Sequence, residues 1–240
     1  MRFNQSEYAE FYYKQQLEAG YPGKLRPFVI DELKDAKTII DIGSGTGFFS
    51  IPLAEAGHRV TSIEPSAEMI NIMKRNSGPD VLSFINICQS TWEDWKGEFH
   101  DAAICIHSLY PMRNIKESLN LINSSSQKKI IIVRNPIKMR TISKVVRVKL
   151  GIFIKDMDFN REIKFFLDER SIKYSIVNIH EERRHLIKDI NQEADSVSYQ
   201  LKLSESEKKN VIKIIKDEID TSVAGDYFNT IYSDNAYVFF

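Results

Sequence analysis

The sequence of 240 residues predicts a doubly wound α/β fold, and three observations support that prediction. Short apolar runs rich in β-branched residues alternate with segments of helical periodicity through the first half of the chain. The runs are almost continuously apolar, which is typical of parallel strands that helices cover on both faces. A glycine-rich turn follows the first of these runs, as expected where a strand leads into a helix.

Seven apolar runs are expected to be strands. In chain order they are Thr38–Ile42, Arg59–Ile63, Leu82–Ile87, Ala102–Ile106, Lys129–Val133, Tyr174–Ile179 and Ala236–Phe240. Between the first five runs, apolar residues recur at helical spacing in Phe48–Ala56, Ser66–Arg75 and Asn114–Ile122. Strand–helix–strand units of this kind form right-handed crossovers, so we expect a doubly wound sheet.

The chain after the fifth run differs, because two long connections follow. Loops of that length without secondary structure are uncommon in compact domains, so both connections are expected to be helical insertions. In the second connection, Ser204-Glu205-Ser206-Glu207 is a capping box that opens a helix. Insertions at these places can form a cap over the carboxyl edge of the sheet, where such folds bind ligands. The predicted organisation is one domain (1–240) with N-terminal helices (1–35), a cofactor-binding core (36–135) and two cap insertions (136–171 and 180–232).

Composition excludes several classes of protein. Lysine plus arginine and aspartate plus glutamate number 33 each, so the formal net charge gives no overall attraction to nucleic acid or anionic membranes. No apolar run reaches the ~20 residues of a membrane span, and the first residues lack the apolar centre of a secretion signal. The only two cysteines, Cys88 and Cys105, exclude a disulfide framework and a four-cysteine zinc site. We therefore expect a cytoplasmic globular protein with no metal centre and no integral membrane association, and the sequence does not indicate its oligomeric state.

One basic segment stands out in this balanced sequence. Residues 128–149 contain eight lysines and arginines and no acidic residue. Apolar residues in Ile137–Leu150 lie at helical spacing, so we interpret the segment as part of an amphipathic helix with a charged, solvated face. The alternatives are that the segment contacts an anionic small molecule, a membrane surface or RNA. RNA is disfavoured, because no aromatic residues are interleaved with the cations.

The turn after the first strand carries the most specific signal. It reads Asp41-Ile42-Gly43-Ser44-Gly45-Thr46-Gly47. One glycine allows the chain to turn sharply, and another allows the backbone to approach a ligand without a Cβ in the way. The helix that follows offers free N–H groups and a partial positive charge to that ligand.

Two acidic residues indicate that the ligand is a nucleoside. Asp41 lies near the end of the first strand, and Glu64 follows the second strand, where a carboxylate can accept both hydroxyls of a ribose. The dinucleotide pattern Gly-x-Gly-x-x-Gly would place its third glycine at Phe48, so a nicotinamide-dependent oxidoreductase is disfavoured. The chain also lacks the Gly-Lys-Ser/Thr sequence of P-loop nucleotidases.

Residues 38–75 resemble the first two motifs of class I S-adenosylmethionine-dependent methyltransferases. The resemblance implies that Glu64-Pro65-Ser66 holds the ribose hydroxyls and that Met69 packs on the adenine. It also implies a seven-stranded, mostly parallel sheet, in which the last strand inserts antiparallel between the fifth and the sixth. The loop residues expected to cradle the methionine and ribose parts are Asp41, Gly43, Ser44, Gly45 and Gly47.

Two later segments also match the family's pattern. After the third strand, Cys88–Glu93 occupies the adenine-binding segment but departs from the common Gly-Asp-Ala form. After the fourth strand, Ile106–Tyr110 matches the segment whose backbone faces the methionine part and the transferring methyl group, which adds His107 to the cofactor contacts. The candidates for the contact with the adenine amine are Gln89, Ser90, Thr91 and Trp92.

The resemblance predicts methyl transfer from S-adenosylmethionine to an oxygen, nitrogen or carbon of a small molecule by in-line displacement, with S-adenosylhomocysteine as the product. Much of the rate can come from positioning the acceptor. His107 is the first candidate for a base that removes the acceptor's proton. His180, Glu181 and His185, which follow the sixth predicted strand, are further candidates, although a solvated turn is the simpler interpretation.

Three other functions stay open as alternatives. One is a regulatory module that binds S-adenosylmethionine without catalysis, and another is an RNA methyltransferase that uses residues 128–149. The Asn/Asp-Pro-Pro-aromatic motif of base-directed amino methyltransferases is absent after the fourth strand, which disfavours nucleic acid as the acceptor. The third alternative, a nicotinamide-dependent oxidoreductase, conflicts with Phe48. An anionic acceptor is one possibility among the small molecules.

Overall fold

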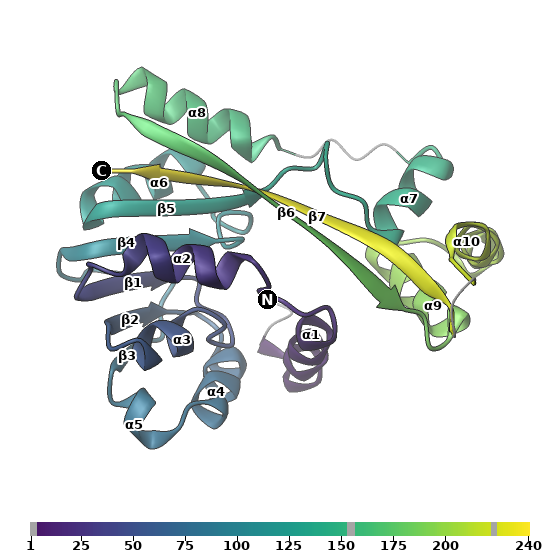
Figure 1. Cartoon of the computed structure of the whole chain (residues 1–240), viewed down its shortest axis with the longest axis horizontal. Helices are drawn as coiled ribbons and strands as arrows, with labels where there is room; N and C mark the ends of the chain where they lie inside the picture. Colours follow the sequence, from purple (N-terminus) through teal and green to yellow (C-terminus); the bar gives the residue numbers. More distant parts are fainter. Residues whose placement is uncertain (1–3, 153–156, 222–224) are drawn as a thin grey trace. The chain divides into compact units, whose positions relative to one another are not determined.

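The computed structural model describes residues 4–152, 157–221 and 225–240, so parts of the expected N-terminal region (1–35) and of both expected insertions (136–171 and 180–232) lie outside the described residues. Figure 1 shows the elements of the chain. In order they are α1 (Ser6–Glu18), α2 (Leu25–Leu33), β1 (Thr38–Ile42), α3 (Ser50–Glu55), β2 (Arg59–Ile63), α4 (Ala67–Asn76), α5 (Pro79–Leu82), β3 (Ile85–Cys88), β4 (His100–Ile106), α6 (Ile115–Ser125), β5 (Ser126–Arg134), α7 (Ile142–Lys149), α8 (Phe159–Glu169), β6 (Tyr174–Leu186), α9 (Ile190–Leu201), α10 (Glu205–Glu218) and β7 (Tyr227–Phe239).

The strands of the described chain form one seven-stranded sheet in the order β3-β2-β1-β4-β5-β7-β6 (Figure 1). Strands β1 to β5 pair in parallel, whereas β7 pairs antiparallel with β5 and lies between β5 and β6. The doubly wound α/β fold with an antiparallel last strand is therefore confirmed. The β5–β7 register places Arg134 directly opposite Asp234.

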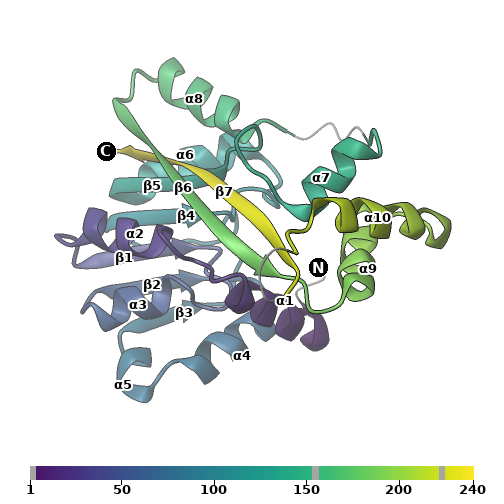
Figure 2. The ribbon, with the colours of Figure 1, turned by 45° about the vertical axis from the view of Figure 1, so that its right-hand side comes forward.

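Helices cover both faces of this sheet, as the continuously apolar strands predicted (Figure 1, Figure 2). On β4, Ile104 points toward one face and Cys105 toward the other, because successive side chains of a strand alternate. Helices α2 and α3 pack on the first face through residues such as Val29 and Leu53. Helices α6 and α8 pack on the second through residues such as Leu119.

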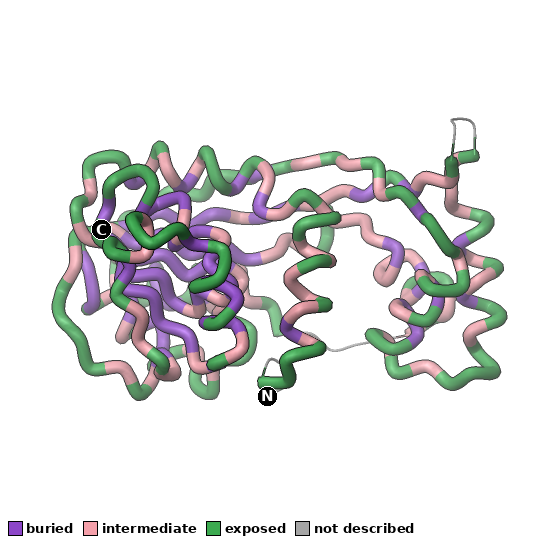
Figure 3. The backbone as a smooth tube through the Cα atoms, turned by 90° about the horizontal axis from the view of Figure 1, so that it is seen from below, coloured by how far each residue is buried: buried purple, intermediate pink, exposed green. Residues whose placement is uncertain are grey.

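The chain divides into two compact units. The first consists of residues 1–134, 158–179 and 234–240, and the second of residues 135–157 and 180–233. Figure 3 shows that buried residues are concentrated in the strands of the first unit. Helix α8 belongs to the first unit although it lies within the expected insertion 136–171, because Ile163, Phe166 and Leu167 are buried in that unit's core.

The second unit has an apolar core of its own. Helices α7, α9 and α10 contribute Val146, Val197, Val211 and Ile215 to it, together with Phe228 from β7. The predicted capping box is present: Glu207 and Ser204 bond reciprocally at the start of α10. Strands β6 and β7 each contribute residues to both units.

Strand boundaries differ from the sequence prediction in five strands. Strands β4 and β5 begin at His100 and Ser126, ahead of the predicted Ala102 and Lys129. Strand β3 begins at Ile85 rather than Leu82, because Pro79 starts a short helix that occupies the preceding residues. Strand β6 continues to Leu186, and β7 begins at Tyr227, so the predicted runs cover only the apolar parts of these two strands. The interpretation of residues 180–185 as a turn after the sixth strand is wrong, because they lie within β6.

Candidate functional site

The glycine loop between β1 and α3 has the backbone that only glycine adopts easily. Gly43, Gly45 and Gly47 have φ values of +69°, +56° and +86°. A Cβ on Gly43 would lie 2.4 Å from the Cβ of Ser108, and one on Gly47 would lie 2.7 Å from Cγ of Met73. A Cβ on Gly45 would meet no atom within 4 Å. Packing therefore requires the outer two glycines, whereas the middle one leaves its backbone open to a ligand.

Glu64 ties this loop to the end of β2. Its Oε2 accepts from the backbone N–H of Gly45 at 3.0 Å, and its Oε1 accepts from the backbone N–H of Ser66 at 2.9 Å. The residue is only 8% exposed. Burial raises the pKa of the Glu64 carboxyl, while the Ser66 and Gly45 donors lower it. Each carboxylate oxygen has a second lone pair, so the group can also accept from the hydroxyls of a ligand.

Asp41 is directed into the protein at the start of α3. Its Oδ2 accepts from the hydroxyl of Ser50 at 2.6 Å, and that hydroxyl lies 2.9 Å from the hydroxyl of Ser62. Burial raises the pKa of Asp41 to about 7, although the bonds from Ser50 lower it. The Asp41 carboxylate therefore fixes the loop to the helix. The Glu64 carboxylate, in contrast, bonds to the middle of the loop, where the backbone is open.

Three buried polar atoms near the loop lack a hydrogen-bond partner in the described chain. They are Oγ of Ser44, Oγ1 of Thr46 and Nε2 of His107. Leaving a buried polar group without a partner costs about 1–3 kcal/mol. Such atoms are expected where a polar ligand completes the bonding, and they lie at the carboxyl ends of β1 and β4, where open α/β sheets bind ligands. The loop thus fits a nucleoside-containing ligand.

Several polar side chains of the segment after β3 already form hydrogen bonds within the protein, so fewer are free for a ligand than the sequence suggested. The indole N–H of Trp92 donates to the carbonyl of Ser118 at 3.2 Å, and this side chain is buried. The hydroxyl of Thr91 donates to Asp94, whose backbone N–H donates back to it. The Ser90 hydroxyl donates to the carbonyl of Thr91. The amine of a bound adenine would therefore meet acceptors of this segment that already form hydrogen bonds with neighbouring residues.

Pro65 and Met69 lie at the start of α4. Pro65 is half-buried between Glu64 and Ser66, the residue that caps the helix. Met69 is buried against Ala9 of α1, and Tyr12 packs on the same cluster. Met69 and Tyr12 thus pack helix α1 against helix α4.

N-terminal aromatic rings also border the glycine loop. The ring of Tyr13 lies 5.7 Å from that of Phe48, and Tyr21 contacts Phe48 edge-on at 5.0 Å. Tyr21 also lies 6.2 Å from the ring of His107. An ion pair between Glu10 and Arg75 joins α1 to α4. Aromatic rings thus line this side of the glycine loop.

His107 follows β4 in a strained conformation. Its φ is +56°, which is uncommon for a residue with a side chain and costs about 1–2 kcal/mol. Its backbone N–H donates to Ile132 at 3.0 Å. Burial lowers the pKa of His107 well below its ordinary value, and the charge of Arg134 lowers it further, so the imidazole is neutral at neutral pH.

The sequence assigned no individual role to three polar residues around His107. The hydroxyl of Tyr110 lies 3.2 Å from Nδ1 of His107, and Oδ1 of Asp234 lies 3.6 Å from its Nε2. One guanidinium nitrogen of Arg134 donates to both oxygens of Asp234 at 3.1 Å. An arginine at the carboxyl end of an apolar strand was the available signal, but Arg134 was counted only as part of the basic segment.

His180, Glu181 and His185 belong to the second unit, whereas the glycine loop belongs to the first. His185 lies 3.4 Å from the carboxylate of Glu193 on α9. No three histidine, cysteine, aspartate or glutamate side chains gather as a metal site in the described ranges. Likewise, no helix within those ranges is both long and apolar enough to span a membrane.

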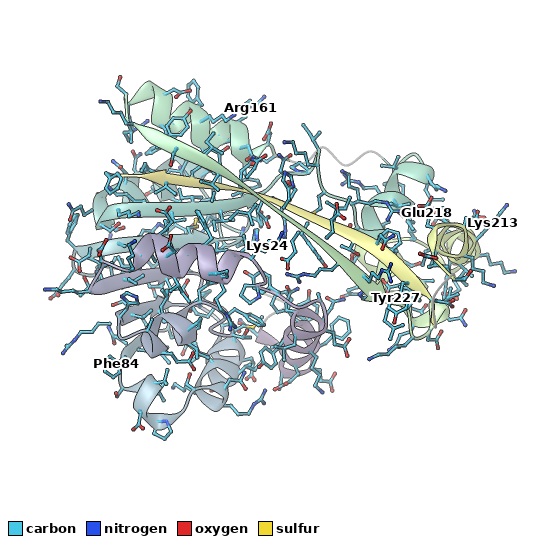
Figure 4. The ribbon with its side chains drawn as sticks, viewed as in Figure 1. Lys24, Phe84, Arg161, Lys213, Glu218 and Tyr227 are labelled. Carbon is cyan, nitrogen blue, oxygen red and sulfur yellow. The ribbon has the colours of Figure 1, made fainter. Side chains whose placement is uncertain are left out.

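The cations of the basic segment 128–149 have partners within the protein. Arg140 and Lys149 both pair at 2.7 Å with Glu218 on α10, which Figure 4 labels. Lys144 donates to backbone carbonyls, including those of Pro136 and Met139. In the first unit, Lys128 pairs with Glu32. The amphipathic helix predicted in 137–150 is the shorter α7, and its charges stabilise the fold.

Comparisons with known proteins agree with this geometry. The family model described as a methyltransferase domain matches residues 33–218. No curated protein matches the sequence significantly. The YcgJ protein from Bacillus subtilis is similar in structure, with a TM-score of 0.61, 11% identity, and coverage of 89% of this chain and 96% of that one.

Two further solved structures share the fold. A provisionally named methyltransferase from an antibiotic biosynthesis pathway of Anabaena variabilis has a TM-score of 0.61 at 11% identity, and covers 88% of this chain and 96% of its own. A precorrin-8w decarboxylase from Methanobacterium thermoautotrophicum has a TM-score of 0.54 at 12% identity, with 91% and 90% covered. At these identities the likeness concerns the fold alone.

Proposed function

Because the chain belongs to the methyltransferase domain family and is an S-adenosylmethionine-dependent enzyme, we propose that it transfers a methyl group to a small-molecule acceptor. One observation carries the proposal. The loop Gly43–Gly47 combines an open backbone at Gly45, a carboxylate of Glu64 bonded to that backbone, and buried hydroxyls without partners at Ser44 and Thr46. This combination suits a ligand that carries ribose hydroxyls and a zwitterionic amino acid.

The residues of the loop and of β2 would hold most of the cofactor. The bound cofactor supplies a methyl group already activated by a sulfonium. Gly45 would let the backbone approach it, Glu64 would accept from the ribose hydroxyls, and Ser44 would bond its polar end. The full proposed set is Asp41, Gly43, Ser44, Gly45, Gly47, Glu64, Pro65, Met69, Ser90, Thr91, Trp92 and His107, with Asp41 acting through Ser50.

The acceptor is proposed to be a small molecule rather than RNA. Binding to RNA would need cations free to meet phosphates. Here Arg140, Lys144 and Lys149 are already bonded within the second unit, which removes the main argument for RNA.

A neutral His107 beside the loop can receive a proton from an oxygen or nitrogen acceptor, and such a base typically contributes ~10²–10⁴-fold to the rate.

The test uses S-adenosylmethionine labelled in its methyl group. The enzyme is incubated with a low-molecular-weight cell extract and, separately, with total RNA, and the labelled product is separated by size. We expect label in the small-molecule fraction only. Label in RNA would overturn the small-molecule proposal, and cofactor binding without label in either pool would favour the regulatory module.

A further inference from the structure

We propose that the acceptor gives its proton to the hydroxyl of Tyr110, which passes its own proton to Nδ1 of His107, while Asp234 positions the imidazole. This inference rests on the proposed function and deepens it. It names the group that the acceptor meets and a route for the proton.

The direction of the proton follows from a backbone donor. The backbone N–H of Arg134 donates to the hydroxyl oxygen of Tyr110 at 2.8 Å. A backbone N–H can only donate, so the proton of the Tyr110 hydroxyl must point elsewhere. Nδ1 of His107 lies within reach at 3.2 Å. If Tyr110 donates to it, Nδ1 is the acceptor nitrogen and the ring carries its proton on Nε2.

The other side of the ring leads to the same tautomer. Nε2 of His107 lies 3.6 Å from Oδ1 of Asp234, which is too long for a normal hydrogen bond but close enough for strong electrostatic preference. An N–H directed toward a carboxylate is favourable, whereas a lone pair there would be repelled. The ring's only lone pair is therefore Nδ1, and it faces Tyr110.

The contacts of the ring and the exposure of Tyr110 indicate which residue an acceptor meets. Nε2 of His107 faces Asp234 and Nδ1 faces the Tyr110 hydroxyl, so both ring nitrogens already face protein groups. Tyr110 is 38% exposed, and its ring packs edge-on against Phe159 of α8 at 5.0 Å. The Tyr110 side chain thus lies between the imidazole and the surface, and burial raises the pKa of its hydroxyl to about 12, which keeps this hydroxyl protonated as a donor to His107.

Neighbouring groups hold this arrangement in place. Arg134 donates to both oxygens of Asp234, whose side chain is 4% exposed, so the carboxylate has a fixed position. The left-handed backbone of His107 adds strain that the surroundings must support, and such strain clusters at functional sites. The aromatic ring of Tyr21 borders the imidazole at 6.2 Å.

The proton balance of the step is simple. The O–H or N–H bond of the acceptor breaks, and a new O–H bond forms on Tyr110 as its original O–H bond breaks. That second proton forms an N–H bond at Nδ1 of His107, and the resulting imidazolium faces Asp234. The two transfers are concerted, so no phenolate accumulates, and no atom is oxidised or reduced. The site is reset by the reverse relay: the Nδ1 proton returns to the Tyr110 oxygen as the proton taken from the acceptor leaves that oxygen for solvent.

The first test reads the tautomer without turnover. Protein labelled with ¹⁵N-histidine is studied by NMR at neutral pH with S-adenosylhomocysteine, and the His107 signals are identified by their loss in His107→Gln. We expect a protonated Nε2 and an unprotonated Nδ1. We also expect Tyr110→Phe to shift the Nδ1 signal, whereas Tyr174→Phe, which removes a hydroxyl bonded to Asp168, leaves it unchanged. A protonated Nδ1 in the unmodified enzyme would overturn the relay.

The second test separates the relay from the proposed function. Binding of S-adenosylhomocysteine and label transfer to the low-molecular-weight extract are measured for the same variants. Tyr110→Phe should keep its affinity for S-adenosylhomocysteine but transfer methyl groups ~10²–10⁴-fold more slowly, and Asp234→Asn should slow transfer to a lesser extent. If Tyr110→Phe transfers label at the unmodified rate, the relay is wrong while the methyltransferase assignment stands. If the unmodified enzyme does not bind S-adenosylhomocysteine, the proposed function itself fails.

Discussion

The glycine loop and the basic segment 128–149 differ in whether their polar groups have partners within the protein. In the loop, the hydroxyls of Ser44 and Thr46 are buried and have no partner in the described chain. In the basic segment every lysine and arginine has an interaction within the protein, including Lys138 and Arg147. The segment with the densest charge is thus bonded within the protein, whereas two hydroxyls of the glycine loop are not. Unsatisfied polar atoms are the better guide to a binding site.

The largest expected effect comes from the buried acid of the loop. The pKa of Asp41 is raised by burial to about 7, from an unfolded value of 3.8, so the folded state binds the extra proton between these pH values. The free energy of unfolding attributable to Asp41 should therefore fall as the pH rises from about 4 to about 7, by up to ~4 kcal/mol. Asp41→Asn should lack this decrease. Urea unfolding of both proteins across the pH range measures the difference, and parallel pH profiles would contradict the assignment.

Close packing of the loop gives the next effect. Gly43→Ala combines a positive φ with a Cβ placed 2.4 Å from Ser108, so we expect a loss of about 2–4 kcal/mol in the free energy of unfolding. Gly57→Ala is the matched control, because its φ is +93° but its Cβ would meet nothing within 4 Å. It should lose only about 1–2 kcal/mol. Equal losses by chemical denaturation would mean that Ser108 does not constrain the loop.

Replacing one glutamate in each region compares the two regions directly. Glu64→Ala removes the acceptor of the Gly45 N–H and should weaken S-adenosylhomocysteine binding by about 1–3 kcal/mol in calorimetry. Glu218→Ala removes the partner of Arg140 and Lys149 in the second unit and should leave that affinity unchanged. Similar losses in both variants would show that the basic segment takes part in cofactor binding.

The smallest effect is expected in the basic segment. Lys149→Gln breaks one exposed ion pair with Glu218, and such pairs contribute less than about 1 kcal/mol. Arg140→Gln should cost more, because the guanidinium also lies 4.2 Å from the centre of the Phe228 ring. Thermal unfolding checks the order. A Lys149→Gln variant that loses methyl transfer while staying folded would show that this segment is part of the functional site.

Sequence patterns predicted the first unit better than the second, for a physical reason. Strands β1 and β2 match their predicted bounds, because buried parallel strands are continuously apolar. The outer part of β6 reads His180–His185, which is polar and charged and gives no strand signal. The start of β7 was missed in the same way.

The same limitation hid part of the site. The family resemblance identified the loop and Glu64, because these depend on local spacing. Asp234 lies in the part of β7 that the sequence did not reveal, so its cross-strand pairing with Arg134 could not be expected. Tyr110 was noticed only as part of a segment, because its bond to the backbone of Arg134 depends on the fold.

The central claim is that the open backbone at Gly45 receives the cofactor, and calorimetric titration with S-adenosylhomocysteine tests it most directly. The unmodified protein, Gly45→Ala and Gly57→Ala are compared. Both glycines have a positive φ and space for a Cβ, so their variants should lose similar stability. We predict that Gly57→Ala binds like the unmodified protein and that Gly45→Ala binds at least about tenfold more weakly, a difference of about 1.4 kcal/mol. Undiminished binding by a folded Gly45→Ala protein would contradict the account.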